Sequence, residues 1–462
     1  MSKKVLLALM MAMILLLSSC ALVVKDEAVD NATEIIRMGD QVITKARVKE
    51  ETQNQLDSMA YMYSMYGYSY DVTDPQNIAD AQEEAITALK QDLALSAKAK
   101  ELGLDQLTED EKTTAQEEAQ KNYDSALDYV KNYMLGDTEG MDDDAIAQAA
   151  ADKLTDMGIS LDSYVETETK TLVDNKLREY AIEGVEVTDE EIESDYNSKV
   201  ESHKTTYGEA AGSWATAANN SSTLYYTPAG VRRVKQILIK FHEEDQTAID
   251  DAKQQVTDAN TAVTTAQAKI DAANTTLEIE GDTEEIKEAR EKAQADLDAA
   301  TMDLEEANAA LEAANKAVED ATNKAFENID AETDEVLAAV NAEGADWQAI
   351  MDEKNQDPGM KNNEKGYAVS SDMTSFDSAF VEAAMALEKP GDHSGKVKGT
   401  SYGYYIIRYE SDEPEGPVAL EDVKESISSS LLSTKQTEAY NAAKAKWVEE
   451  AGIKVDLNAL KD

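Results

Sequence analysis

Cysteine, proline, phenylalanine and basic residues are all scarce in this sequence of 462 residues. A single cysteine excludes an intrachain disulfide and a cysteine-based metal site. Lys and Arg number 43 against 94 Asp and Glu, which gives a formal net charge of −51. Because such a chain repels polyanions, we expect no nucleic-acid partner, and an anionic bilayer would repel the body of the protein. No Ser/His/Asp or metal-binding constellation is visible, so the sequence does not indicate a hydrolase.

Ala, Glu and Gln are abundant, and together with only six prolines they predict a mostly helical protein. The length exceeds that of one usual hydrophobic core, so we expect two or three domains. Strand patterns at residues 34–44, 231–241 and 404–407 add sheet to the helices. The predicted class is therefore α+β with mostly helix.

The first twenty residues have the pattern of an export signal. Two lysines precede thirteen apolar residues, Val5–Leu17, a run too short to cross a membrane. The run ends in Leu-Ser-Ser-Cys20, which resembles a bacterial lipobox. This resemblance implies cleavage before Cys20, a diacylglycerol on its thiol, and anchorage to the outer face of the cell membrane. An ordinary signal peptide with an incidental cysteine is the alternative. Residues 21–33 are predicted to form an unstructured tether.

Residues 34–208 predict a helical domain that opens with a strand, a turn and a second strand at 34–44. Capping boxes at Thr108–Glu111 and Thr188–Glu191 predict two helix starts. Residues 61–70, YMYSMYGYSY, hold five tyrosines and two methionines. Such adaptable side chains suit the binding of varied unfolded polypeptides. The alternative is a loop that folds back on the domain's own core.

A compact α+β unit is predicted from residues 347–410 and from an apolar strand at 231–241, VRRVKQILIKF. Residues 347–410 contain two helix patterns, an Asp-Pro-Gly turn, and strands that end in Tyr-Tyr-Ile-Ile. Residues 209–230 are low in charge and rich in Ala, Ser, Asn and Gly, which predicts a linker or an exposed loop before this unit.

Between these two parts, apolar residues recur in a heptad pattern at 249–277 and again at 286–325. A short turn containing Gly281 separates the two series. Two such helices pair most simply with each other, so residues 245–325 predict an antiparallel coiled-coil hairpin, an arm of roughly 40 Å. The arm either contacts unfolded polypeptides, a partner or a second copy, or is only a spacer. An intermolecular coiled coil is a third option.

Residues 231–241 and 347–410 together resemble a parvulin-type peptidyl-prolyl isomerase domain, here spanning 231–412 and interrupted by the hairpin. The order of signal, helical region, this domain and a long helix within 418–462 is similar to the PrsA-type, SurA-like foldase lipoproteins of Gram-positive bacteria. The resemblance implies that residues 34–208 form a chaperone domain. It also implies that the C-terminal helix returns to complete that domain.

The resemblance assigns polar site residues. Asp357 matches the Cys-or-Asp position of the family, while Gln236 and Tyr405 replace its two histidines. Gln and Tyr can still form hydrogen bonds. The three histidines of this chain fall at none of these positions, so the resemblance implies isomerase activity that is weak or lost. Asp357 can also be interpreted as part of a common Asp-Pro-Gly turn.

A substrate pocket is implied as well. Phe380 matches the pocket phenylalanine of the family, and Phe376 falls at its pocket methionine, with Met373 as the rival for that position. Rotation about an X-Pro bond has an intrinsic barrier of about 18–20 kcal/mol. Lowering it requires an apolar pocket and polar groups that favour the twisted amide. We expect no cofactor and no metal, because this chemistry uses neither.

The leading hypothesis is a lipid-anchored foldase and chaperone, outside the membrane, that binds unfolded or partly folded secreted polypeptides. The rival is a non-catalytic adaptor lipoprotein whose parvulin fold is a scaffold and whose hairpin docks a partner or a second copy in a homodimer.

Overall fold

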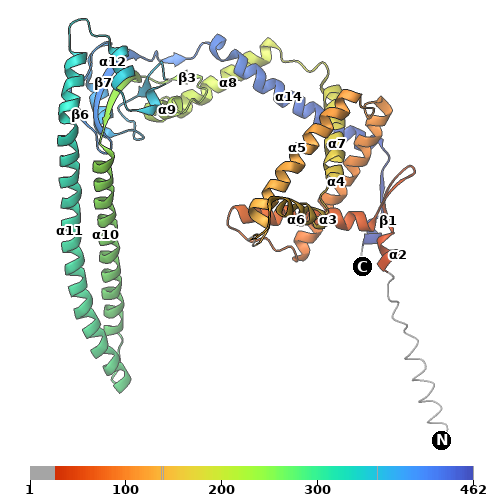
Figure 1. Ribbon diagram of the computed structural model, residues 1–462, viewed down its shortest axis with the longest axis horizontal. Helices are drawn as coiled ribbons and strands as arrows, with labels where there is room; N and C mark the ends of the chain where they lie inside the picture. The colour runs from red at the N-terminus through yellow and green to blue at the C-terminus, as the bar shows by residue number, and fades with distance from the viewer. Residues whose placement is uncertain (1–26, 137, 139, 362, 461–462) are drawn as a thin grey trace, which may run out of the picture. The chain divides into compact units, whose positions relative to one another are not determined.

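The computed structural model describes residues 27–136, 138, 140–361 and 363–460 (Figure 1). The predicted signal peptide, Cys20 and the first part of the tether lie outside these ranges. The chain divides into two compact units: one ends at Val187 and resumes from Ser429, and the other runs from Thr188 to Ser428. The class is α+β with mostly helix, as the sequence predicts. Within the described ranges, no helix is both long and apolar enough to span a bilayer.

A three-stranded antiparallel sheet joins the two ends of the first unit. β1 (Glu34–Met38) pairs with β2 (Gln41–Thr44) on one side and with β9 (Lys454–Val455) on the other. Ile36 of β1 is buried in one cluster with Leu89. The strand, turn and strand predicted at 34–44 is confirmed, and the C-terminal strand completes its sheet.

Helices form the rest of the first unit. Trp447, near the C-terminus, packs in one buried cluster with Leu95 and Leu177. The C-terminal helix therefore contributes to the core of the first unit. The elements are α2 (Glu27–Asn31), α3 (Lys45–Met65), α4 (Pro75–Leu102), α5 (Glu109–Tyr129), the π-helix η1 (Val130–Met134), α6 (Asp143–Asp156), α7 (Leu161–Ile182), the second part of α14 (Leu420–Glu450) and the 3-10 helix η3 (Leu457–Leu460).

The segment before β1 is more ordered than the sequence predicts. The unstructured tether expected for residues 21–33 is wrong from residue 27 on, where α2 begins. Asp30 of α2 forms an ion pair with Lys45 of α3, with 3.2 Å between Oδ2 and Nζ, and the lysine side chain is only 1% exposed. A buried ammonium requires a carboxylate partner. The pair therefore fixes α2 on α3, a long-range contact that composition alone does not reveal.

A four-stranded antiparallel sheet in the order β5-β4-β7-β6 forms the centre of the second unit. Helices cover both of its faces. The elements of this unit are α8 (Asp189–Tyr207), α9 (Ala211–Asn219), β3 (Tyr226–Thr227), β4 (Arg232–Lys240), α10 (Glu243–Leu277), α11 (Glu284–Val340), α12 (Trp347–Lys354), the 3-10 helix η2 (Pro358–Met360), β5 (Tyr367–Val369), α13 (Ser378–Ala386), β6 (Val397–Lys398), β7 (Gly403–Asp412), β8 (Gly416–Pro417) and the start of α14.

Residues 209–230 are not a linker. They contain α9 and β3, and Trp214 of α9 is buried, with its Nε1 donating to the carbonyl of Tyr226 at 2.7 Å. The low charge of this stretch reflects burial against the sheet rather than exposure. The two units also part at Thr188, so α8 groups with the second unit instead of with residues 34–187.

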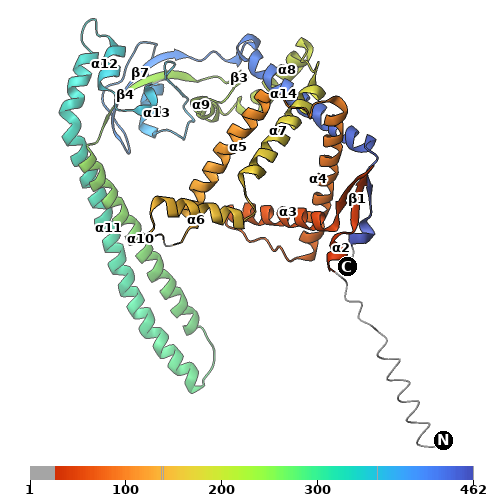
Figure 2. The ribbon, with the colours of Figure 1, turned by 45° about the vertical axis from the view of Figure 1, so that its right-hand side comes forward.

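α10 and α11 lie side by side as a helical hairpin in both views (Figures 1 and 2). Alanines of the predicted heptad positions are buried along its seam. Lys269 pairs with Asp303 at 2.8 Å, and Asn328 donates to Asp245 at 2.9 Å, which fixes the antiparallel register. α11 continues beyond residue 325, and its last turns cover one face of the sheet. The second helix therefore belongs to both the arm and the core.

Candidate functional site

The two central strands direct alternate side chains to opposite faces of the sheet. Leu238 lies opposite Tyr405, and Ile237 lies opposite Ile406. Ile237 and Ile406 pack with α11 and α12 in one buried cluster. Leu238 and Tyr405 pack with α9 and α13 in another. The polar candidate Gln236 stands two residues before Leu238, on the α13 side.

A cavity of about 370 Å³ opens on the α13 side of the sheet. It brings together five of the six site residues predicted in this unit, and the sixth, Met373, is buried in the core and is not among its lining residues. Its volume falls in the range of small-ligand and peptide sites. The lining residues are Gln236, Leu238, Lys240, Asp357, Pro358, Tyr367, Ser375, Phe376, Asp377, Phe380, Tyr402 and Tyr405.

Asp357 is the centre of a hydrogen-bond network at the cavity. Its Oδ2 accepts from Nε2 of Gln236 at 2.6 Å and from the hydroxyl of Tyr367 at 2.9 Å. Its Oδ1 accepts from the backbone N–H of Gly359 at 2.9 Å. All three partners are donors, as a carboxylate requires. The acid is therefore held by neutral groups rather than by a charged partner.

The chain before Asp357 is fixed to the edge of β4. Oδ1 of Asn355 accepts from the backbone N–H groups of Leu238 at 2.8 Å and Asp357 at 3.1 Å. The backbone N–H of Gln356 donates to the carbonyl of Leu238 at 3.0 Å. β5 is only three residues long and pairs with β4 only as far as Val234. The bonds from Asn355 and Gln356 take the place of strand pairing at Leu238. Asp357 thus stands in the Asp-Pro-Gly turn and also lines the cavity.

Aromatic rings form the apolar wall of the cavity. The ring of Phe376 lies 5.0 Å from Tyr367 and 5.7 Å from Phe380, and Phe380 lies 5.3 Å from Tyr405, all measured between centroids. Edge-to-face contacts of this kind hold each ring in place. Phe376, rather than Met373, therefore occupies the wall.

The partly buried Tyr367 and the buried Tyr405 keep their protons. Burial, together with the nearby carboxylate of Asp357, raises the pKa of Tyr367 well above its usual range. Burial first, and then the charge of Asp377, does the same to the pKa of Tyr405. Both hydroxyls consequently act as neutral donors. Among the described residues that line the cavity there is no histidine and no cysteine, and therefore no group with an ordinary pKa near neutrality.

Gln236 has one unused acceptor. The side chain is 6% exposed, its Nε2 is engaged by Asp357, and its Oε1 has no hydrogen-bond donor among the described residues. Buried polar atoms of this kind are normally satisfied by water or a ligand.

Two lining residues, Tyr367 and Asp377, were not predicted from the sequence. Tyr367 precedes two buried residues on a short strand, and only the pairing of that strand with β4 brings it to Asp357.

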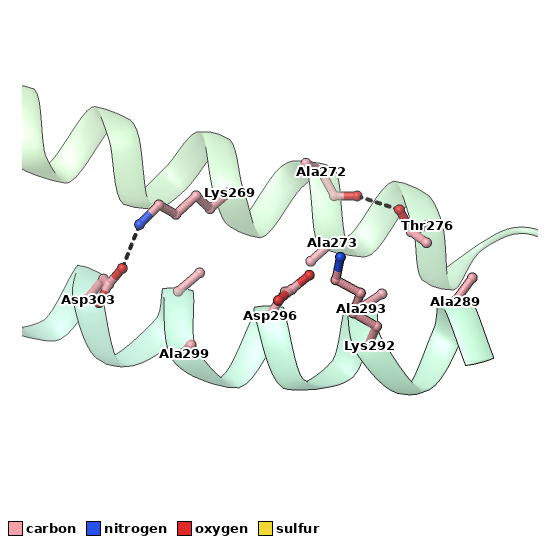
Figure 3. A pocket seen from close by; sticks show the side chains of 11 residues that line it. Lys269, Ala272, Ala273, Thr276, Ala289, Lys292, Ala293, Asp296, Ala299 and Asp303 are labelled. Atoms are coloured by element: carbon pink, nitrogen blue, oxygen red, sulfur yellow. Dashed lines mark hydrogen bonds and ion pairs between the residues drawn. The ribbon is translucent and has the colours of Figure 1, made fainter. Parts of the chain in front are cut away.

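A second hollow, of about 560 Å³, lies along the hairpin (Figure 3). It is walled by small side chains such as Ala272, Ala273 and Ala293. Lys269 is already paired with Asp303 at one end. The hollow follows from the alanine seam, and Lys292 and Asp296 also line it. Among the described residues, no group of three His, Cys, Asp or Glu side chains could hold a metal ion.

Comparison with known proteins finds similarity to bacterial foldases. The chain is 35% identical over 112 residues to the foldase protein PrsA of Clostridium botulinum strain Hall, and equally to that of strain Langeland. The match spans 24% of this chain and 32% of each relative, so the chain covers about a third of the length of these curated relatives. The predicted resemblance to PrsA-type foldases is confirmed to this extent.

No family model matches the chain. A solved PrsA foldase of Streptococcus pneumoniae aligns at 14% identity over 93% of this chain and 97% of its own, with a TM-score of 0.22. A SurA-like chaperone of Campylobacter jejuni aligns at 14% identity over 72% of this chain and 95% of its own, with a TM-score of 0.25. At these scores neither structure establishes a shared fold.

Proposed function

We propose that this chain is an extracytoplasmic foldase and chaperone that binds unfolded segments of secreted proteins. The observation that carries the proposal is the aromatic cavity of the second unit, with a fixed acid at its edge, in a chain similar to curated foldases. The ring of a bound proline would lie against Phe376 and Phe380. The unit that contains the predicted chaperone domain would hold a second part of the polypeptide.

Isomerase activity at this cavity is proposed to be weak or absent. Catalysis must favour the twisted amide over the planar one. Of the donors that line the cavity, the amide of Gln236 and the hydroxyl of Tyr367 already donate to Asp357, and the hydroxyl of Tyr405 is neutral. The charged donor Lys240 is exposed at the end of β4. Neutral donors stabilise developing charge less than ionised ones do. Peptide binding depends mainly on the apolar wall and would be retained.

The test is NMR exchange spectroscopy of an X-Pro tetrapeptide with the full chain and its Phe380→Ala and Asp357→Ala variants. We expect peptide binding by the wild type, little acceleration of isomerisation, and loss of binding in Phe380→Ala. The double variant Gln236→His with Tyr405→His should raise the isomerisation rate. Turnover by the wild type at the level of an efficient isomerase would contradict the proposal of weak catalysis.

Anchorage through lipid on Cys20, at the outer face of the cell membrane, is part of the proposal. The lipobox-like sequence Leu-Ser-Ser-Cys20 supports it. Radiolabelled palmitate should be incorporated into the wild type, and Cys20→Ser should be released into the medium or left unprocessed. Unchanged membrane association of Cys20→Ser would contradict it.

A non-catalytic adaptor that docks a partner through the α10–α11 hairpin is the second candidate. The length of the hairpin, with a 57-residue α11, favours it. The adaptor predicts one tight partner whose capture depends on the hairpin. The foldase predicts suppressed aggregation of several unrelated unfolded proteins. The two measurements separate the candidates.

A further inference from the structure

The end of α3 carries a large exposed apolar surface. We name it the α3 tip and define it by its six exposed side chains, Tyr61, Met62, Tyr63, Met65, Tyr66 and Tyr68. The alternative of a loop folded onto the domain's own core is therefore wrong for these residues. Apolar patches of this kind on a soluble protein mark interaction sites. No charged residue occurs in the whole stretch 61–70.

The α3 tip is an ordered surface. The helix ends at Met65 with Tyr66 as its C-cap, and Gly67 follows with a φ of +76°, a conformation that favours glycine. The backbone N–H groups of Gly67 and Tyr68 return to the carbonyls of Ser64 and Tyr63, both at 3.0 Å. The rings of Tyr63 and Tyr70 then meet at 5.1 Å. The turn thus holds Tyr66 and Tyr68 outward, which reduces the ordering cost of binding.

The charges around the α3 tip indicate what it binds. The forty residues from Glu50 to Leu89 contain eight carboxylates and no Lys or Arg. Asp57 lies one helical turn before Tyr61, and Asp71 follows Tyr70 directly. The ring faces of tyrosine attract Lys and Arg through cation–π contacts. The negative potential of the nearby carboxylates attracts the same cationic side chains.

We infer that the α3 tip docks extended polypeptide segments that combine apolar side chains with Lys or Arg. The inference rests on the proposed foldase function and names its substrate class at a second surface. Met and Tyr adapt to varied partners, so the selection is by charge and apolar character rather than by sequence. A second copy of the chain is disfavoured as the occupant, because the same carboxylates would face each other.

The test is fluorescence anisotropy of three labelled peptides with the full chain. The first alternates Phe and Lys among Gly and Ser, the second has Glu for Lys, and the third has Ser for Phe. We expect the first to bind at least about tenfold more tightly than either of the others. High salt should weaken its binding, since it screens exposed charges.

Two variants locate the binding. The variant Tyr61→Ser, Met65→Ser, Tyr66→Ser, Tyr68→Ser should weaken binding of the first peptide by about tenfold or more. The single variant Tyr66→Ser should weaken it less. Its matched control is Tyr133→Ser on η1, because Tyr133 is as exposed as Tyr66, 76% in both cases. The control should bind the peptide as the wild type does.

The outcomes are distinguishable from failure of the proposed function. Wild-type binding of the first peptide that survives in the four-residue variant overturns the docking surface while the foldase proposal stands. An equal loss in the Tyr133→Ser control, or equal binding of all three peptides, also overturns it. A dimer that forms without peptide and is lost in the four-residue variant would make a second copy the occupant. A wild type that binds none of the peptides and does not suppress aggregation contradicts the foldase proposal itself.

Discussion

The two faces of the β5-β4-β7-β6 sheet are built from the same strands but are filled differently. On one face, Ile237 and Ile406 are buried beneath the end of α11, with Phe326 and Ile329 packed over them. On the other face, α13 is only nine residues long, and a cavity remains beside it. A filled face stabilises the unit. An open face on the same strands can bind a ligand without loosening the sheet.

The largest effect should come from the filled face. Phe326 is buried between the rings of Phe241 at 4.8 Å and Tyr404 at 4.9 Å. Phe326→Ala should therefore cost about 3–5 kcal/mol of unfolding free energy, because it leaves a cavity in the core. Phe376→Ala on the open face should cost about 1 kcal/mol and instead weaken binding of an X-Pro peptide. Urea denaturation and peptide titration of both variants measure the contrast. Equal losses of unfolding free energy in the two variants would mean that both faces contribute equally to stability, and would contradict the contrast.

A smaller effect is expected within the open face, at Gly359. A Cβ at this position would overlap the hydroxyl of Tyr367, which donates to Asp357. Gly359→Ala should displace Tyr367 and destabilise the unit by about 1 kcal/mol, the contribution of one hydrogen bond. The affinity for an X-Pro peptide should also fall, because Tyr367 lines the cavity. Gly395→Ala is the control, since nothing lies within 4 Å of the added methyl group. A crystal structure of Gly359→Ala with Tyr367 unmoved would contradict this account.

The sequence predicted the helices and strands better than it predicted the contacts between them. Heptad spacing predicted both hairpin helices, and capping residues predicted helix starts at Thr108 and Thr188. The helix in 209–230 was missed because small uncharged residues suit a loop and a buried helix equally. The continuation of α11 into the core was missed because the heptad pattern ends before Phe326.

The residues of the candidate site also divide into those that the sequence predicted and those that it did not. One cavity is lined by five of the predicted residues: Gln236, Asp357, Phe376, Phe380 and Tyr405. Pairing of β4 with β7 brings Gln236 and Tyr405 together, and the other three lie in α13 or between elements. Tyr367 and Asp377 could not be found from local pattern, because their roles depend on side chains far away in the sequence. The anchoring at Cys20 stays a prediction.

Alkaline pH should act on tyrosines of both faces, because burial, and then the hydrogen bond to Asp330, also raises the pKa of Tyr404 on the filled face. The variant Tyr367→Phe isolates the contribution of the open face. The pKa of Tyr367 and that of Tyr405 are raised by burial and by nearby carboxylates. A group with a raised folded-state pKa holds its proton more tightly when folded, so its stabilising contribution is complete below its unfolded pKa of about 10 and is lost as pH rises above it. The unfolding free energy of the wild type should therefore fall more steeply above pH 10 than that of Tyr367→Phe.

Between about pH 6 and 9, peptide affinity should be flat, because none of the described lining residues has an ordinary pKa in that range. Isothermal titration across this range checks it. A bell-shaped profile would mean that a titrating group outside the cavity lining controls binding.

The smallest effect should come from shortening the arm. Asp245 contacts Asn328 and Lys269 contacts Asp303, so residues 259 and 313 face each other in the same register. Replacing residues 260–312 by a short Gly/Ser turn keeps the contacts of Ile249 and Phe326 with the sheet. We expect the unfolding free energy of the second unit to change by less than about 0.5 kcal/mol, as for surface changes that leave the core intact. X-Pro peptide binding should not change, because the cavity lies on the other face. Unfolding of the shortened protein would contradict this expectation. It would show that the whole length of the hairpin, and not only its end at the sheet, stabilises the filled face.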